Sequence, residues 1–516
     1  MRAAVVGVVW WWSAVAAAAM PPMDPVEQAR ERAGTPALWH REGALTPAGR
    51  ALLAQLAAAD ERGLNPADYD VQTLQALATA HDAASQATLD RRLSQAAVLL
   101  ATHLQRGRVT PAAAGYQLPL PAPAEDPVAT LLALSGSTDL PAALDGFEPH
   151  YNHYHLLKQA LAQYRQLAAL PPLPALPALP MRSVKPGETY AGADALRARL
   201  ARLGDLPAAQ ASSSGTVLDE VLAAALARFQ GRHGLQPDGV LGAGTLAALQ
   251  VPLTDRVRQL HLSMERARWL PRPSGPFILV NIPQFRLYAF RGPGDSEQHM
   301  LAMNVIVGRT FPSHNTPVFM ADMRYVVFRP YWDVPPSIAR NEILPKLRER
   351  LAWGGEQDYE LVRGQSDSSQ VVAWEPAALD ALQRGELRVR QKPGARNALG
   401  RVKFMFPNPY NVYLHSTPAQ SLFARSERAF SHGCVRVEDP QALGEFVFAA
   451  ESGWNAARVA DRLQAQGGPE RVNLSRSLRV IIFYATAIAA EDGRILFLPD
   501  LYRHDQRLTR LLAGRL

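Results

Sequence analysis

Residues 431–436 of this 516-residue chain read Ser-His-Gly-Cys-Val-Arg, and Cys434 in this run is the only cysteine in the sequence. Residues 413–418, Tyr-Leu-His-Ser-Thr-Pro, place a second histidine, His415, at the exit of an expected strand. Beyond the cysteine, Asp439 and Pro440 supply an N-cap and a first-turn proline, and apolar residues then follow at helical spacing. The pattern predicts a cysteine in a glycine-containing loop shortly before a helix.

These residues suit acyl transfer. A thiolate is the reactive form of cysteine, and its pKa falls beside a cationic histidine or arginine. Gly433 lets the backbone approach closely, so consecutive N–H groups around Cys434 are candidates for an oxyanion hole. A histidine on another strand, His415, can serve as the base.

A structural reading stays open for each residue taken alone. A free cysteine is often a small buried hydrophobe, and a histidine at a strand end is usually structural. Arg436 follows a loop, where an arginine usually pairs with a local acid, here Glu438 or Asp439.

The first 20 residues resemble an export signal. Arg2 precedes an apolar core over residues 3–15, and alanines fill residues 16–19. The apolar stretch is short for a spanning helix, although an uncleaved anchor stays open. We therefore expect an exported protein in the periplasm of a Gram-negative-type envelope, where a lone cysteine has no internal disulfide partner.

Bulk composition is that of a globular protein, with 47% hydrophobic and 20% charged residues and a net charge of +7. The excess basicity is diffuse and no nucleic-acid motif appears, so we expect no nucleic-acid partner and membrane contact only through an uncleaved N-terminal segment. His150, His153 and His155 lack a thiol or carboxylate at ligand spacing, so we expect a surface turn there, with no metal and no cofactor.

Periodicity divides the chain into regions of a multidomain α+β protein. Ala/Leu-rich helical spacing predicts a helical scaffold, proline density predicts a stiff extended linker, and a change from helical to alternating apolar spacing marks a β-rich domain. The predicted boundaries are a signal peptide at 1–20, scaffold at 21–170, linker at 171–186, a compact helical unit at 187–252, and a β-rich domain at 253–516 with a capping insertion at about 331–400.

The compact unit resembles the small three-helix peptidoglycan-binding domain. Its hallmark matches residues 229–239, Phe-Gln-x-x-His-Gly-Leu-x-Pro-Asp-Gly. The resemblance implies a glycan-wall ligand, although some such domains serve only as spacers.

The β-rich domain resembles the catalytic domain of L,D-transpeptidases of the YkuD type, which carry a histidine, about sixteen residues, and then Ser-His-Gly-Cys. Here 16 residues separate His415 from His432. Residues 332–338, 343–346 and 397–404 support the match, and the order of domains resembles the larger, YcbB-like branch.

The resemblance implies a role for each matching residue. Cys434 would be the nucleophile and His415 its general base, oriented by the main-chain carbonyl of Ser416. Gly433 would provide oxyanion-hole backbone. The implied substrate-binding residues are His432, Arg436 and Tyr413.

The implied reaction joins peptidoglycan tetrapeptide stems. The cysteine forms a thioester with the diaminopimelate at stem position three, and the amine of another diaminopimelate resolves it into a 3→3 cross-link, without a metal or cofactor. Carbapenems acylate this family. The acceptor is left open between that amine, water (an L,D-carboxypeptidase), a free D-amino acid and a lipoprotein lysine. A non-catalytic wall-binding scaffold and a cysteine protease are the alternatives from other classes, and protein partners and oligomeric state stay undetermined.

Overall fold

The computed structural model describes residues 24–119, 126–211, 214–271, 274–292, 295–309 and 314–514, so the predicted signal segment lies outside the described residues. The chain divides into two compact units. The first comprises the described parts of Met1–Ala57, Pro66–Ala101 and Ala124–Asp145, and the second comprises the rest. In the described part of the chain, every helix is too short or too polar to cross a bilayer.

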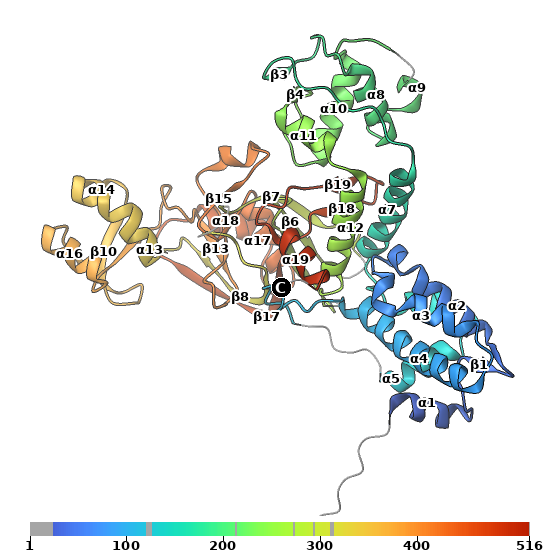
Figure 1. Cartoon of the computed structure of the whole chain (residues 1–516). Helices are drawn as coiled ribbons and strands as arrows, with labels where there is room; N and C mark the ends of the chain where they lie inside the picture. The colour runs from blue at the N-terminus through green and yellow to red at the C-terminus, as the bar shows by residue number, and fades with distance from the viewer. Residues whose placement is uncertain are drawn as a thin grey trace, which may run out of the picture. The chain divides into compact units, whose positions relative to one another are not determined.

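The first unit contains most of the helical scaffold predicted at 21–170 (Figure 1), whereas η1 (Ala59–Arg62), the end of α4 (Ala83–Arg106) after Ala101 and α7 (Asn152–Ala169) belong to the second unit. Leucines at helical spacing form its core, with Leu52, Leu56, Leu93 and Leu100 fully buried, because a three- and four-residue spacing places them on one face of each helix. Its elements are α1 (Pro25–Ala33), β1 (His40–Arg41), β2 (Ala44–Leu45), α2 (Pro47–Ala57), η2 (Pro66–Tyr69), α3 (Val71–Ala78), α4 (Ala83–Arg106), α5 (Pro127–Ser135) and α6 (Leu140–Asp145).

The second unit includes η1 (Ala59–Arg62) and helix α7 (Asn152–Ala169). The expected surface turn at His150, His153 and His155 is wrong, because α7 begins at Asn152 and the latter two histidines lie in its first turn. The His153 Nδ1–H donates a hydrogen bond to the Ala489 carbonyl at 3.2 Å. Within the described residues, no group of three His, Cys, Asp or Glu side chains could hold a metal ion.

The proline-rich stretch 171–180 contains no helix, as predicted, but it is not a free spacer. Leu176 is buried in the core of the following domain, and the Tyr190 hydroxyl donates to the Pro177 carbonyl at 2.7 Å. Arg199 and Arg202 donate to other main-chain carbonyls of the stretch. Proline carbonyls have no helix partners, so they remain available to bind the neighbouring domain.

The predicted three-helix domain follows, with two additions that the sequence did not predict. These are a short helix and a two-residue strand pair. The elements are β3 (Ser183–Val184), α8 (Ala193–Arg202), α9 (Ala208–Ala211), α10 (Glu220–Arg232), β4 (Leu241–Gly242) and α11 (Ala243–Gln250). The buried Gln230 amide donates to Val240 and accepts from Gly239 N–H at 2.8 Å, which holds the glycine-rich loop of the 229–239 run.

The β-rich domain is built on a nine-stranded sheet in the order β15-β7-β16-β14-β13-β8-β17-β5-β6. An additional pairing of β6 with β7 closes the sheet on itself. The strands are β5 (Phe277–Asn281), β6 (Arg286–Phe290), β7 (Leu301–Gly308), β8 (Phe319–Phe328), β13 (Val402–Met405), β14 (Leu414–His415), β15 (Ala429–Ser431), β16 (Val435–Val437) and β17 (Glu470–Phe483).

Further elements complete this domain (Figure 1). Asp439 caps α17, as predicted, by accepting a hydrogen bond from the Ala442 N–H. The elements are α12 (Leu253–Ala267), η4 (Gln420–Ala424), α17 (Pro440–Phe448), α18 (Ala456–Gln464), β18 (Ala487–Ala489), β19 (Ile495–Phe497) and α19 (His504–Leu512).

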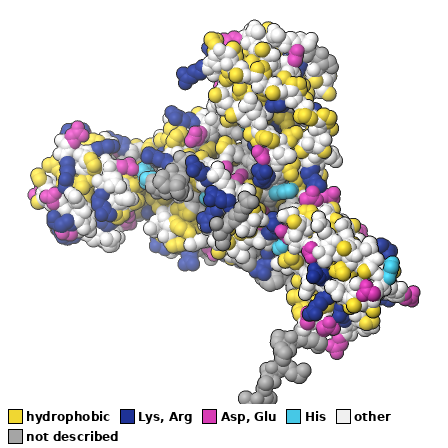
Figure 2. All heavy atoms as spheres, viewed as in Figure 1, with side chains coloured by type: hydrophobic (Ala, Val, Ile, Leu, Met, Phe, Trp, Pro, Cys, Tyr) yellow, Lys and Arg dark blue, Asp and Glu magenta, His cyan; other side chains and the backbone are white. Residues whose placement is uncertain are grey.

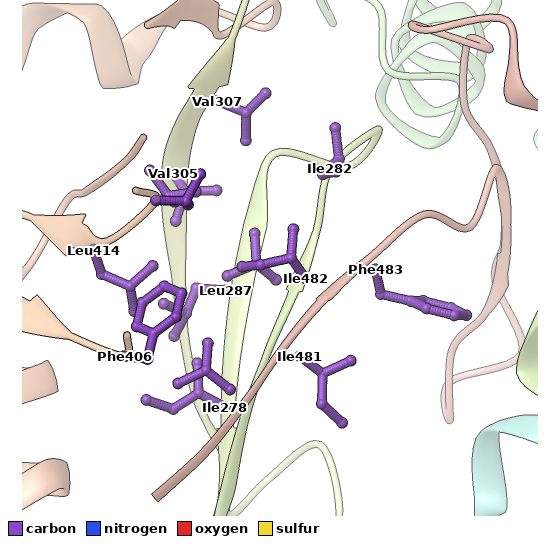
Figure 3. Close-up of a cluster of buried hydrophobic side chains, with 14 of the residues drawn as sticks. Ile278, Ile282, Leu287, Val305, Val307, Phe406, Leu414, Ile481, Ile482 and Phe483 are labelled. Atoms are coloured by element: carbon purple, nitrogen blue, oxygen red, sulfur yellow. The ribbon is translucent and has the colours of Figure 1, made fainter. Parts of the chain in front are cut away.

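Fully buried side chains from most of these strands fill one face of the sheet. Ile278, Leu287, Val305 and Leu414 come from four different strands and lie together in the core (Figure 3). Because side chains alternate along a strand, the residues next to Leu414 project to the opposite face. Burial of Leu414 in the core therefore fixes the face of β14 from which His415 projects.

Residues 332–391 form a second sheet with a core of its own, at the position of the expected insertion. Strand order is β11-β10-β12-β9, and Leu347, Leu361 and Val389 are fully buried between the sheet and its helices. The elements are β9 (Trp332–Asp333), α13 (Pro336–Ile338), the π-helical turn η3 (Ala339–Ile343), α14 (Leu344–Glu349), α15 (Ala352–Glu356), β10 (Tyr359–Arg363), β11 (Gln370–Val372), α16 (Pro376–Arg384) and β12 (Arg388–Gln391).

Charged side chains are mixed on the surface. Figure 2 shows Lys and Arg interspersed with Asp and Glu on the viewed face. The sequence contains 54 basic and 47 acidic residues, and many arginines pair with carboxylates in the described structure, for example Arg350 with Glu356. Because of this pairing, the excess positive charge is spread over the surface.

Candidate active site

Two short parallel strands place the cysteine and the histidine on the same face of the sheet. Strand β14 pairs with β16 so that Leu414 lies opposite Val435 and His415 lies opposite Arg436. Leu414 and Val435 are both fully buried in the core. By alternation, His415, Arg436, Tyr413 and Cys434 project from the other face of the sheet.

The imidazole of His415 is held in one orientation. Its Nδ1 lies 2.6 Å from the Ser416 carbonyl oxygen, so Nδ1–H donates and Nε2 carries the lone pair. The Ser416 hydroxyl is itself fixed, because it accepts from the Arg401 N–H at 2.7 Å and donates to the Leu399 carbonyl at 3.0 Å. Gly400 allows this contact, since its φ is +63° and a Cβ there would overlap the Ser416 side chain. This is the geometry that the predicted orienting role of Ser416 requires.

His415 is a neutral imidazole in this environment. Its pKa is lowered to about 3, first by burial and then by the positive charge of Arg436, with a smaller effect from Lys403. Lys403 lies directly opposite His415 on β13, and burial lowers the pKa of its own amine. A neutral ring with a lone pair at Nε2 can act as a general base, which takes the thiol proton while the sulfur attacks.

The thiol of Cys434 is neutral as well, contrary to expectation. Burial raises its pKa, and this outweighs the opposing effects of hydrogen bonds with Tyr413 and the charge of Arg436. The sulfur lies 3.7 Å from the Asn411 carbonyl oxygen, to which the S–H is directed. The expected lowered pKa is therefore wrong for the free site, because desolvation disfavours the thiolate more than the nearby cation favours it.

This neutral pair predicts how alkylation of Cys434 depends on pH. Thiolate accumulates only as pH rises towards the raised pKa, so the rate of modification by iodoacetamide should keep increasing beyond pH 9. A preformed thiolate–imidazolium pair would give a plateau between about pH 5 and 8 instead. Stopped-time mass spectrometry of the intact protein measures the rate, and a plateau at neutral pH would contradict the neutral thiol.

Two hydroxyl groups hold the cysteine loop. The Ser431 Oγ accepts from the Gly433 N–H at 3.1 Å and donates to the Cys434 carbonyl at 2.5 Å. The Thr316 Oγ1 donates to the Gly433 carbonyl at 2.8 Å and accepts from the Gly308 N–H. Gly433 has φ of +117°, a conformation that L side chains rarely adopt.

These contacts correct the expected oxyanion hole. The Gly433 N–H is already bonded to Ser431, so it is not free to bind an oxyanion in this conformation. Among the described residues, no partner for the Cys434 N–H is seen. The backbone donor that the loop offers is thus the amide of Cys434, while the glycine contributes its unusual φ.

Arg436 is not paired with the local acids. Glu438 instead binds Asn304, and Asp439 caps α17, so the expected pairing of Arg436 with a local acid is wrong. Its Nε is buried without a hydrogen-bond partner in the described structure, and burial lowers the pKa of its guanidinium. An arginine desolvated in this way is suited to bind a carboxylate.

The other predicted binding residues lie at the edges of the site. The Tyr413 ring is 5.7 Å from the His415 ring, and its hydroxyl interacts with Cys434, which together with burial raises the pKa of Tyr413. His432 turns towards the second sheet, where its Nε2 lies 2.6 Å from Glu342 Oε1 in η3. Its ring also packs edge-on against His314 at 4.7 Å.

Three residues of the site were not predicted. Thr316 and Glu342 lie 118 and 92 residues before Cys434, and no spacing in the sequence connects them to it. Lys403 lies in the 397–404 stretch, which supports the family resemblance, but the resemblance implies no role for this lysine. The signal that could have identified Lys403 is a charged residue within an otherwise apolar strand.

Comparisons with known proteins agree with this division of the chain. Residues 275–450 match the L,D-transpeptidase catalytic domain, residues 190–249 a "Putative peptidoglycan binding domain", and residues 30–161 a scaffold domain. A Haemophilus influenzae protein named "Putative L,D-transpeptidase" is 32% identical over 251 residues, 49% of this chain and 49% of that protein. The chain thus spans about half the length of this curated relative. Cys434, His415 and the second sheet all fall within the matched catalytic domain.

Proposed function

We propose that the protein is an exported L,D-transpeptidase that forms 3→3 cross-links between peptidoglycan stems through a thioester on Cys434. The observation that carries the proposal is the shared sheet face of Cys434 and His415, with His415 Nδ1 held by the Ser416 carbonyl. A thiol beside an oriented, neutral imidazole is the arrangement that nucleophilic acyl transfer requires.

The first half-reaction uses the neutral pair directly. As Sγ attacks the carbonyl of the third stem residue, the thiol proton passes to Nε2 of His415, and the Cys434 N–H stabilises the developing oxyanion. The imidazolium then gives that proton to the amine of the terminal D-Ala, which departs and leaves the thioester. Arg436, with its unpartnered Nε, binds a carboxylate of the stem.

The second half-reaction transfers the acyl group to an amine. A diaminopimelate amine of another stem attacks the thioester, His415 receives a proton from the attacking nitrogen, and Sγ regains it as the C–S bond breaks. Residues 332–391 contact the cysteine loop through Glu342, and we infer that this insertion restricts water at the site. The peptidoglycan-binding domain would hold the enzyme at the wall, and the segment 1–20 would export it to the periplasm.

Product analysis tests the proposal. The purified protein is incubated with disaccharide-tetrapeptides, and muropeptides are separated and sequenced by mass spectrometry. We expect release of D-Ala, dimers joined between two diaminopimelate residues, and a covalent adduct on Cys434 after exposure to meropenem. Tripeptide without dimer would identify an L,D-carboxypeptidase. Absence of both D-Ala release and adduct would overturn the assignment of the site.

A further inference from the structure

The insertion contacts the cysteine loop through a carboxylate and an imidazole. Glu342 Oε1 lies 2.6 Å from Nε2 of His432, two residues before Cys434. Glu342 lies in η3, the π-helical turn between α13 and α14. Such turns are rare and frequently occur at functional sites. Both side chains keep contact with solvent, with 46% and 21% of their surfaces exposed, so a ligand can reach the pair.

We propose that Glu342 and His432 form the site that binds and deprotonates the acceptor amine, so that Glu342 is the residue that favours an amine over water. The proposal rests on the proposed function, because it assigns the acceptor part of the same active site. His432 takes a proton from the acceptor, and Glu342 both orients His432 and supplies the negative charge that the ammonium group meets.

The arrangement is that of a base oriented by a carboxylate. With Glu342 accepting from Nε2–H, the lone pair of His432 is at Nδ1, and no hydrogen bond to Nδ1 is seen among the described residues. A carboxylate on one ring nitrogen fixes the tautomer and stabilises the imidazolium that forms when the other nitrogen takes a proton. His415 has a carbonyl in the equivalent position, which supplies orientation without a charge.

The charges around Cys434 favour an anionic contact for the acceptor in addition to the Asp333 carboxylate, which acts on Lys403 and Tyr413. Arg436 and Lys403 are cations beside the catalytic pair, and both lower the pKa of His415. They suit a donor stem with free carboxylates, but they repel an incoming ammonium group. In the described structure, Glu342 is the carboxylate that hydrogen-bonds residues 431–436. An ammonium approaching along the insertion therefore meets a negative charge before it meets the cations.

The proton balance requires a second base. An acceptor arrives as an ammonium with three N–H bonds and becomes an amide with one, so two protons leave its nitrogen. His432 takes the first and releases it to water, which gives the neutral amine. His415 takes the second as the amine attacks the thioester carbonyl, and delivers it to Sγ when the C–S bond breaks. His415 is already used for the second proton, so the first needs another acceptor, and His432 carries the nearby lone pair at Nδ1.

The test separates the two half-reactions in the full-length protein. The variant Glu342→Gln keeps the size of the side chain and removes its charge, Glu342→Asp restores the charge, and Glu349→Gln is a matched control. Glu349 is exposed at the end of α14 in the same insertion. Acylation is followed as the rate of the meropenem adduct and as D-Ala release. Transfer is followed as 3→3 dimers formed per D-Ala released, over a range of acceptor concentrations.

For Glu342→Gln we expect the dimer yield per D-Ala to fall about tenfold or more, with a raised KM for the acceptor and acylation within about twofold of the unaltered protein. Glu342→Asp should recover part of the yield, and Glu349→Gln should change nothing. An unchanged dimer yield, or an equal fall in acylation and transfer, overturns the inference while the proposed function stands. If the unaltered protein releases D-Ala but forms no dimer, the transpeptidase proposal itself fails, and the amine site fails with it.

Discussion

Replacing Cys434 by alanine is expected to reduce D-Ala release and dimer formation by more than about 10⁴-fold, to below detection in most assays. The thiol is the sole cysteine side chain of the protein, and the neighbouring hydroxyls are engaged in holding the loop. Ser431 in particular bonds the Gly433 N–H and the Cys434 carbonyl, so it cannot take over as nucleophile without breaking the loop.

The same substitution should leave the fold intact. The sulfur interacts with the Asn411 carbonyl at 3.7 Å and with Tyr413, and the loop contacts of Ser431 and Thr316 use main-chain atoms that alanine retains. We expect the thermal unfolding midpoint to change by no more than about 2 °C, because partly exposed positions outside the core contribute little. Cys434→Ser serves as a control for the fold, because it replaces the thiol with a side chain of similar shape. Turnover in Cys434→Ala with an unchanged midpoint would show that the nucleophile lies elsewhere.

Local sequence patterns predicted helices and strands well where burial of one face alone decides the structure. The alternation over residues 277–290 gave two strands with a tight turn, and the structure has β5 and β6 there. The leucine spacing at 196–200 and 222–229 likewise gave α8 and α10. In these stretches, burial of one face decides the local structure, and burial is visible in the order of residues.

Predictions failed where contacts with a distant segment of the chain decide the local structure. Cys434 lies in a loop shortly before α17, as predicted, but the three-residue strand β16 between them was not predicted, because it forms by pairing with β14 and β7. The strand expected to end at His415 is only two residues long, because β14 begins at Leu414. Short strands of this kind depend on partners that are far away in the sequence.

The electrostatics of the site were the least predictable part. The motif indicated a thiol near cations and therefore a lowered pKa, but the opposite direction follows from burial, which a linear sequence does not show. The contact between Glu342 and His432 spans 90 residues and depends on how the second sheet folds. The identities of the reacting groups were readable from the sequence, whereas their protonation states and the residues that orient them were not.

Replacing His415 by alanine is expected to slow acylation of Cys434 by about 10³-fold or more, because the neutral thiol then loses the base that takes its proton. The substitution also removes the donor to the Ser416 carbonyl and leaves a small cavity, so stability should fall by about 1–3 kcal/mol. His432→Ala should instead retain measurable acylation, because that ring is bonded to Glu342 and is not held beside the thiol by the Ser416 carbonyl.

A second variant separates chemistry from structure at this position. In His415→Gln, the side-chain amide can donate to the Ser416 carbonyl and fill much of the space, but it has no group that accepts a proton at neutral pH. We expect its unfolding midpoint to recover most of the loss in His415→Ala while acylation by meropenem stays equally slow. If both properties recover together, His415 acts only by supporting the loop. If His432→Ala is slower in acylation than His415→Ala, the two histidines have exchanged roles, because the ring that accepts the thiol proton must limit the first half-reaction.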